Sequence, residues 1–89
     1  MKAVVTVVGQ DRTGIIASVS GYLAEKNINI LDISQTIMQD IFTMIMLVDT
    51  VASDITAGQL SEDLKAMGET IGTEINVQHE GLFSAMHRI

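Results

Sequence analysis

The chain has 89 residues, 47% of them hydrophobic, which suits one small domain with a limited core and points to self-association as a source of stability. It contains no cysteine and only two histidines, so disulfides and thiolate metal sites are excluded and no metal or other cofactor is expected. Its net charge of −6 argues against nucleic acid and against an anionic membrane, because both attract basic surfaces.

The first predicted element is a strand from Lys2 to Val8, a run rich in valine and threonine. It ends at Gly9, which is too early for the apolar core of a signal peptide, and no other run approaches the roughly 20 residues of a membrane span. We therefore expect a cytoplasmic protein with no membrane partner. Both faces of the strand are apolar, because Val4 and Val8 alternate with further valines.

A helix is predicted from Gly14 to about Asn27. Apolar positions recur along one stripe at helical spacing: Ile15, Ile16, Val19, Tyr22 and Leu23. Asn27 is a suitable stop, because asparagine tolerates the left-handed backbone conformation that ends many helices.

Residues 28–48 are predicted to form two strands joined by a turn at Gln39 and Asp40. Opposed residues then have numbers that sum to 79, and a slip of one residue would exchange the two faces. One face is nearly all apolar and is predicted to be the helix-covered core, with the pairs Ile37–Phe42, Gln35–Met44, Ile33–Met46 and Leu31–Val48. The other face is mixed, with the pairs Met38–Ile41, Thr36–Thr43, Ser34–Ile45 and Asp32–Leu47.

A second helix is predicted to begin at a capping box, in which the Thr56 and Gln59 side chains both satisfy free backbone N–H groups. Gly72 is a natural stop for this helix, and a half-exposed strand follows from Thr73 to His79. A short tail then places apolar residues at helical spacing, namely Leu82, Phe83, Met86 and Ile89.

The resulting order, β-α-β-β-α-β, predicts a ferredoxin-like α+β fold: a four-stranded antiparallel sheet with both helices on one face, plus a short C-terminal helical tail. We expect one domain at residues 1–79, with residues 80–89 docking on it or on a dimer partner, because so short a helix is not stable alone. The sheet face opposite the helices would be bare and partly apolar in a monomer. A homodimer is the simplest cover for it.

The loop at residues 8–15 is the stretch most informative about function. Free backbone N–H groups and the helix dipole at such a turn favour an anion such as a carboxylate, and Gly14 allows close approach. Arg12 could hold that carboxylate, and Asp11 could accept from an ammonium group. The alternative is a tight turn with a capping Asp11 and a solvated Arg12. Asn29 likewise suits either a ligand contact or an ordinary strand edge.

These residues carry a resemblance to a known family. Residues 11–15, Asp-Arg-Thr-Gly-Ile, resemble the Asp-x-x-Gly-Ile/Leu signature of ACT domains, and Asn29-Ile30 resembles the Asn-Ile pair at the start of their second strand. The resemblance extends from Lys2 to about His79. Residues 33–36 and 83–89 are similar to the small stand-alone ACT proteins of the UPF0237 group, which in turn are similar to the ACT modules of the glycine-cleavage-system repressor and formyltetrahydrofolate deformylase.

The resemblance implies a regulatory, non-enzymatic module that binds an amino acid between two subunits and acts on a regulated protein partner. Carried over residue by residue, the ligand-binding positions are Asp11, Arg12, Thr13, Gly14, Ile15, Asn29 and Ile30. Many ACT domains have proline before the glycine, where this chain has Thr13. The alternative is a protein–protein scaffold that binds no ligand.

Two other classes of function have little support in the sequence. His79 and His87 are the only histidines, and no nucleophile motif or paired carboxylates accompany them, so catalysis has no anchor. RNA-recognition modules share this strand order but need exposed aromatic residues on the central strands. The only strand aromatic, Phe42, falls on the predicted core face.

Overall fold

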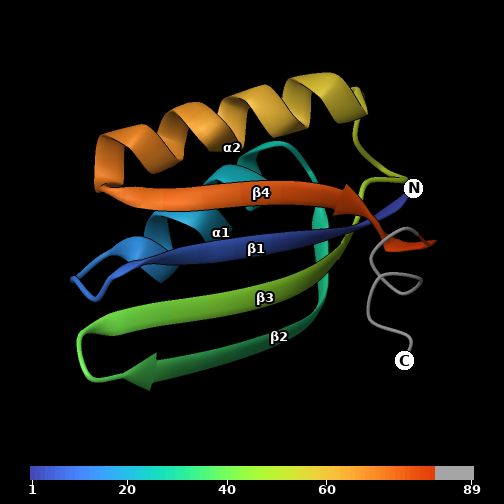
Figure 1. Ribbon diagram of the computed structural model, residues 1–89. Helices are drawn as coiled ribbons and strands as arrows, with labels where there is room; N and C mark the ends of the chain where they lie inside the picture. The colour runs from blue at the N-terminus through green and yellow to red at the C-terminus, as the bar shows by residue number, and fades with distance from the viewer. Residues whose placement is uncertain (82–89) are drawn as a thin grey trace.

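The computed structural model describes residues 1–81, which form the predicted βαββαβ order (Figure 1). The sheet is antiparallel in the order β2-β3-β1-β4, and both helices cover one face, so the predicted ferredoxin-like fold is confirmed. The predicted apolar positions of the tail, from Leu82 onward, lie outside the described residues. The elements are β1 (Lys2–Gln10), α1 (Ile15–Glu25), β2 (Asn29–Met38), β3 (Ile41–Asp49), α2 (Ala57–Ile71) and β4 (Thr73–His79).

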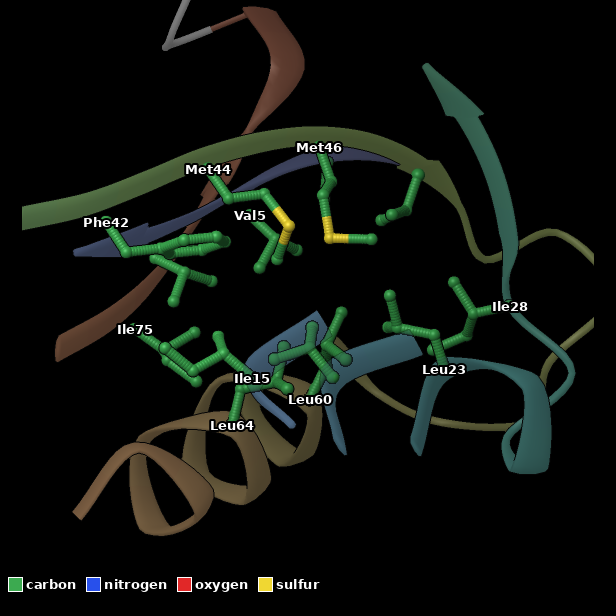
Figure 2. Packing of buried hydrophobic residues seen from close by; sticks show 14 residues of the cluster. Val5, Ile15, Leu23, Ile28, Phe42, Met44, Met46, Leu60, Leu64 and Ile75 are labelled. Atoms are coloured by element: carbon green, nitrogen blue, oxygen red, sulfur yellow. The ribbon is translucent and has the colours of Figure 1, made fainter. Parts of the chain in front are cut away.

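The core lies between the sheet and the two helices (Figure 2). Val5, Met44 and Met46 extend from the sheet and meet Leu23 and Leu64 from the helices, and all five are fully buried. Burying such a side chain contributes about 1.5–3 kcal/mol, so this one layer is the main source of stability. Within residues 1–81, neither helix has the length and apolar character needed to cross a membrane.

The predicted β2–β3 register is confirmed from Met38–Ile41 to Asp32–Leu47. Gln39 adopts a positive φ of 56°, which allows the tight turn without a glycine. The predicted pair Leu31–Val48 is wrong. A bulge between Ile30 and Asp32 shifts the register by one residue, so that Ile30 is the partner of Val48.

The predicted burial of β2 is also wrong. Phe42 and its alternate neighbours in β3 are buried as expected, but Ile33 and Ile37 in β2 are 45% and 53% exposed. Alternation along a strand shows which face a side chain points to, but it does not show whether a helix above reaches that strand. β2 is an edge strand, and among its residues only Ile30 packs against the core.

The helix ends are set by local chemistry. Asn27, with φ of 61°, and Gly72, with φ of 74°, follow α1 and α2 in the left-handed conformation, as predicted. Thr56 caps α2 by accepting from the Gln59 N–H at 3.1 Å. The reciprocal half of the capping box is wrong, because the Gln59 side chain donates to Asp63 instead.

The sheet face opposite the helices is called the outer face below. Side chains of β1 and β3 alternate between the two faces, and those on the core side belong to the buried cluster. The outer face therefore carries Val4, Thr6, Val8, Ile41, Thr43, Ile45 and Leu47 from these two strands.

Candidate functional site

The candidate site is the loop from β1 to α1. It lies at the same end of the sheet as the β2–β3 turn, and the two are joined by a hydrogen bond from the Asp11 N–H to the Asp40 carbonyl at 2.7 Å. Asp11, Arg12, Thr13 and Gly14 are all exposed. The predicted ligand-binding loop is thus open to solvent at these four residues.

Gly14 supplies the conformation that ends the loop. Its φ of 94° is one that residues with a Cβ adopt only at a cost of about 1–2 kcal/mol. A Cβ built on Gly14 would have no heavy atom within 4 Å, so the space above this backbone is open. The glycine is thus needed for its backbone conformation, and it leaves the start of α1 free for close approach.

The start of α1 carries unsatisfied donors. The Ser18 N–H donates to the Gly14 carbonyl, which leaves the N–H groups of residues 15–17 without partners inside the helix. Within residues 1–81 no side chain caps them, whereas Thr56 caps the start of α2. The capping role considered for Asp11 is therefore wrong. An uncapped N-terminus with its positive dipole end exposed favours an anion.

Arg12 connects the loop to the far end of α2. Its Nη1 donates to the Ile71 carbonyl at 2.9 Å, so the side chain satisfies a free carbonyl at the C-terminus of that helix. A guanidinium has five N–H donors, and this contact uses one of them. Arg12 can therefore hold its position through α2 and still present charge and donors to an anion.

A small pocket lies between these parts. Its volume is about 140 Å³, and Arg12, Thr13, Gly14, Ser18 and Thr70 are among the residues that line it. Ser18 and Thr70 were missed by the sequence analysis, because a polar residue on a helix gives no signal of its own. The Arg12 contact with the end of α2 is what brings Thr70 to the loop.

The side chains of two predicted site residues pack in or against the hydrophobic core. The Ile15 side chain is 2% exposed and belongs to the buried cluster, so only its backbone N–H faces the loop. Ile30 is half-buried and packs against the same cluster. Neither side chain is free to make a specific contact with a polar ligand.

Asn29 lies at the opposite end of the sheet from Gly14 in the same chain. Asn29 is paired with Asp49, whereas Gln10, just before the loop, is paired with Ile41. Eight residues of β3 separate the two pairs, which corresponds to about 26 Å along the strand. One chain therefore does not bring the two parts of the predicted site together.

A second polar cluster links the two helices. The Tyr22 hydroxyl donates to Asp63 Oδ2 at 2.6 Å, and Gln59 donates to the other carboxylate oxygen. Burial, together with the hydrogen bond to Asp63, raises the pKa of Tyr22 far above its usual value. The bonds from Tyr22 and Gln59 lower the pKa of Asp63. Both shifts favour the hydrogen-bonded forms, which is the behaviour of a structural contact.

A larger depression of about 640 Å³ lies between the end of α1 and the loop before α2, beside Lys26, Asn27 and Asp54. It is wide and open to solvent, and none of the predicted site residues lines it. Across residues 1–81, no three potential ligands among histidine, aspartate and glutamate are grouped to hold a metal ion. The loop at Gly14 is therefore the better candidate, and its chemistry suits the binding of a carboxylate.

Comparison with known proteins identifies the family and the fold. Residues 2–78 match a family model described as ACT domain. The chain is 52% identical over 88 residues to a UPF0237 protein from Methanopyrus kandleri, covering 99% of this chain and 98% of that one.

Among solved structures, an ACT domain protein from Streptococcus pneumoniae has a TM-score of 0.83 and 42% identity, with 93% of both chains covered. A putative glycine cleavage system transcriptional repressor has a TM-score of 0.74 and 24% identity, over 89% of this chain and 47% of that one. A formyltetrahydrofolate deformylase from Pseudomonas putida has a TM-score of 0.78 and 14% identity, over 89% of this chain and 29% of that one. At such low identities, the last two show a shared fold alone.

Proposed function

The chain belongs to the ACT domain family, whose members are generally regulatory ligand-binding domains, and from this premise we propose that it binds an amino acid or a related small carboxylate between two copies of itself. Its role is regulatory and non-enzymatic. The ligand changes how the copies associate, and that change is passed to a protein partner.

One observation carries the proposal: the open, uncapped start of α1 behind Gly14. A carboxylate placed there would accept from free backbone N–H groups and would lie beside the Arg12 guanidinium. Asp11 and the hydroxyls of Thr13 and Ser18 offer acceptors for an ammonium group. An amino acid matches both requirements with one small molecule.

A homodimer would supply the missing half of the site. β2 is an edge strand with exposed Ile33 and Ile37, so a second copy can pair with it and cover its apolar side chains. Antiparallel pairing of two β2 strands about a two-fold axis reverses the direction of the second strand. Its Asn29 then lies near Met38 of the first copy, at the end of the sheet that carries the Gly14 loop.

A complementation experiment tests this shared site. Gly14→Val blocks the loop of each copy, and Asn29→Ala removes the amide that each copy supplies to its partner. Each variant alone should bind no member of a panel of L-amino acids in titration calorimetry. In a mixture, the heterodimer has one site with an intact loop and an intact Asn29, so binding should return at reduced stoichiometry.

The matched control is Asn76→Ala, which removes an exposed asparagine from β4, the other edge strand, and should leave binding unchanged. Circular dichroism checks that each variant is folded, and light scattering checks that it is dimeric. Failure of the wild type to bind any amino acid at millimolar concentration would contradict the proposal that the ligand is an amino acid. Binding by each variant alone would contradict the proposal that the Gly14 loop and the partner copy's Asn29 form the site.

The second candidate is a scaffold that binds no ligand, and the exposed apolar side chains of β2 favour it. The same surface that suits a second copy could dock a different protein by strand addition. The two functions differ in one measurement. Capture of a partner that is indifferent to added amino acids supports the scaffold, whereas capture that changes with them supports the regulatory module.

A further inference from the structure

The edge strand β2 lacks the features that usually keep an edge from pairing with a further strand. Such edges carry charges, prolines or bulges along their length. Of the ten residues of β2 only Asp32 is charged, and none is lysine or proline. Its bulge lies at the start, so the segment from Asp32 to Met38 pairs regularly with β3. The free edge of this segment is therefore suited to accept another strand.

The side of α1 nearer to β2 is uncharged as well. Ser18 and Tyr22 line a groove together with α2, and at about 100° per residue this places Ile16 and Ser20 on the other side of α1. Ile16 is 38% exposed, and the Ser20 hydroxyl donates to the Ile16 carbonyl at 2.7 Å. Glu25, the only charged residue of α1, lines the groove towards α2. An uncharged surface suits a second copy, because charged contacts between two chains of net charge −6 would be mostly repulsive.

The two faces of the sheet restrict how two copies of β2 can pair. Ile33 and Ile37 point to the helix side of the sheet, whereas Ser34 and Thr36 point to the outer face. Directly opposed residues of an antiparallel pair share a face, so odd-numbered residues of the segment must oppose odd-numbered ones. A two-fold axis between the copies then passes through a single residue, which lies opposite the same residue of the partner.

One of these registers uses the whole regular segment. Its midpoint is Gln35, halfway between Asp32 and Met38. With Gln35 on the axis, Ile33 of each copy opposes Ile37 of the other, so both exposed isoleucines gain an apolar neighbour. Asp32 opposes Met38, and no two charges face each other. Moving the axis by one residue in either direction would place Gln35 opposite an isoleucine.

The register also fixes the position of the partner's Asn29. With Gln35 on the axis, and with the extra residue of the bulge counted, the partner's Asn29 lies level with Asp40 of the first copy. The Asp40 carbonyl accepts from the Asp11 N–H, so this position adjoins the loop that leads to Gly14. Moving the axis by one residue would move the partner's Asn29 by two residues, or about 7 Å. Only a narrow range of registers therefore completes the proposed site.

We propose that two copies pair through β2 with Gln35 on the two-fold axis. Ile33 of one copy then packs against Ile37 of the other, and Asn29 of each copy completes the site at the Gly14 loop of its partner. The role of Asn29 and the use of β2 rest on the proposed function, whereas the register follows from the pattern of β2 itself. The sheets of the two copies become continuous, with all helices on the same face.

Single cysteines identify the residue on the axis, because the chain has no cysteine of its own. Ser34→Cys, Gln35→Cys and Thr36→Cys are made in the full-length chain at exposed positions. A residue on the axis has its Cα about 4.5–5.5 Å from its copy, within the range of a disulfide. One residue away the distance is about 7–8 Å, which a disulfide does not span without backbone movement. With oxidised glutathione as the oxidant, Gln35→Cys should cross-link at least about tenfold faster than the other two on non-reducing gels.

Two further measurements control for chance collisions and for effects of the Gln35 substitution. Asn76→Cys lies at the midpoint of β4, the other edge strand, and should cross-link no faster than the off-axis variants of β2. Ile33→Cys and Ile37→Cys should each fail to cross-link alone, because each lies two residues from the axis. A mixture of the two should form a disulfide between different chains, since these positions oppose each other.

The outcomes separate the register from the proposed ligand. Fastest cross-linking through Ser34→Cys or Thr36→Cys would overturn the register. Cross-linking in β2 that is no faster than through Asn76→Cys would overturn the pairing of two copies and leave this edge for a different protein. Cross-linking through Gln35→Cys, in a protein whose wild type binds no L-amino acid in titration calorimetry, would support the register and contradict the ligand alone.

Discussion

The two edge strands of the sheet, β4 and β2, differ in how far their side chains are buried. At the β4 edge, Ile75 is buried beneath α2 and Val77 is half-buried. At the other edge of the sheet, formed by β2 (Figure 1), every residue from Leu31 to Met38 is exposed. One βαβ half of the molecule completes its own packing, whereas the other leaves apolar side chains and a strand edge for something else to cover.

The helices explain the difference. α2 has 15 residues and lies so close to β4 that a Cβ on Gly68 would be 2.6 Å from the Thr73 carbonyl oxygen. α1 has 11 residues, and its Gly21 lies on the exposed side, where a Cβ would meet nothing within 4 Å. The backbones of α2 and β4 therefore approach closely in one half, while the other half carries the uncapped helix start at Gly14.

The largest effect is expected from removing core volume in the complete half. Leu64→Ala, at a fully buried position of α2, should lower the free energy of unfolding by about 2–5 kcal/mol. Ile33→Ala in β2 should cost less than about 1 kcal/mol at protein concentrations where the chain is monomeric, because no core surrounds it. Urea denaturation measures both.

Varying the protein concentration tests the comparison between Ile33→Ala and Leu64→Ala further. If a second copy covers β2, the cost of Ile33→Ala should grow as the protein concentration rises, because association stabilises the wild type more than the variant. The cost of Leu64→Ala should change little. A cost for Ile33→Ala that matches Leu64→Ala at every concentration would mean that β2 is as well packed as β4.

A smaller effect, with opposite signs in the two helices, is expected from glycine substitutions. Gly21→Ala should stabilise the protein by about 0.5–1 kcal/mol, because alanine is the better helix former and its methyl group meets open space. Gly68→Ala should destabilise it by about 1–3 kcal/mol, because the methyl group must displace the backbone of β4. Thermal unfolding of the pair at one protein concentration is the measurement. Equal signs would contradict the difference between the surroundings of the two glycines.

The sequence predicted most of this architecture because its elements are bounded by strong local signals. Thr56, Gly72 and Asn27 act through their own side chains or backbone. The rule that paired residue numbers in β2 and β3 sum to 79 holds wherever the strands alternate regularly. The prediction from the sequence failed at the Ile30–Asp32 bulge, because no glycine marks it. It also failed for the burial of β2, because that burial depends on how far α1 extends over the sheet.

The candidate site was predictable only in part, for a related reason. The Gly14 loop is local, and its residues could be read directly from the chain. The distance to Asn29 is set by topology: β2 starts at the end of the sheet where α1 finishes, so the two segments cannot meet within one copy. The Arg12 contact with Ile71 joins residues 59 positions apart and has no sequence signal.

The smallest effect concerns the contact that ties the two halves together. Tyr22 of α1 donates to Asp63 of α2, and Tyr22→Phe removes that hydrogen bond while keeping the ring. Because the contact is only partly buried and solvent screens it, the loss at pH 7 should be at most about 1 kcal/mol. Lys26, which lies 5.9 Å from the Tyr22 ring centroid, should keep its position.

The pH dependence of that loss identifies the carboxylate as the acceptor. The pKa of Asp63 is lowered in the folded state, so its contribution is present above the unfolded value of about 3.9 and is lost as pH falls through the folded value. The pKa of Tyr22 is raised, so its contribution is present below the unfolded value of about 10 and is lost only in more strongly alkaline solution. The gap in urea stability between wild type and Tyr22→Phe should therefore be constant from about pH 5 to 9 and should narrow below about pH 4. A gap that persists unchanged in acid would mean that the Tyr22 hydroxyl stabilises the protein without needing the ionised Asp63 carboxylate.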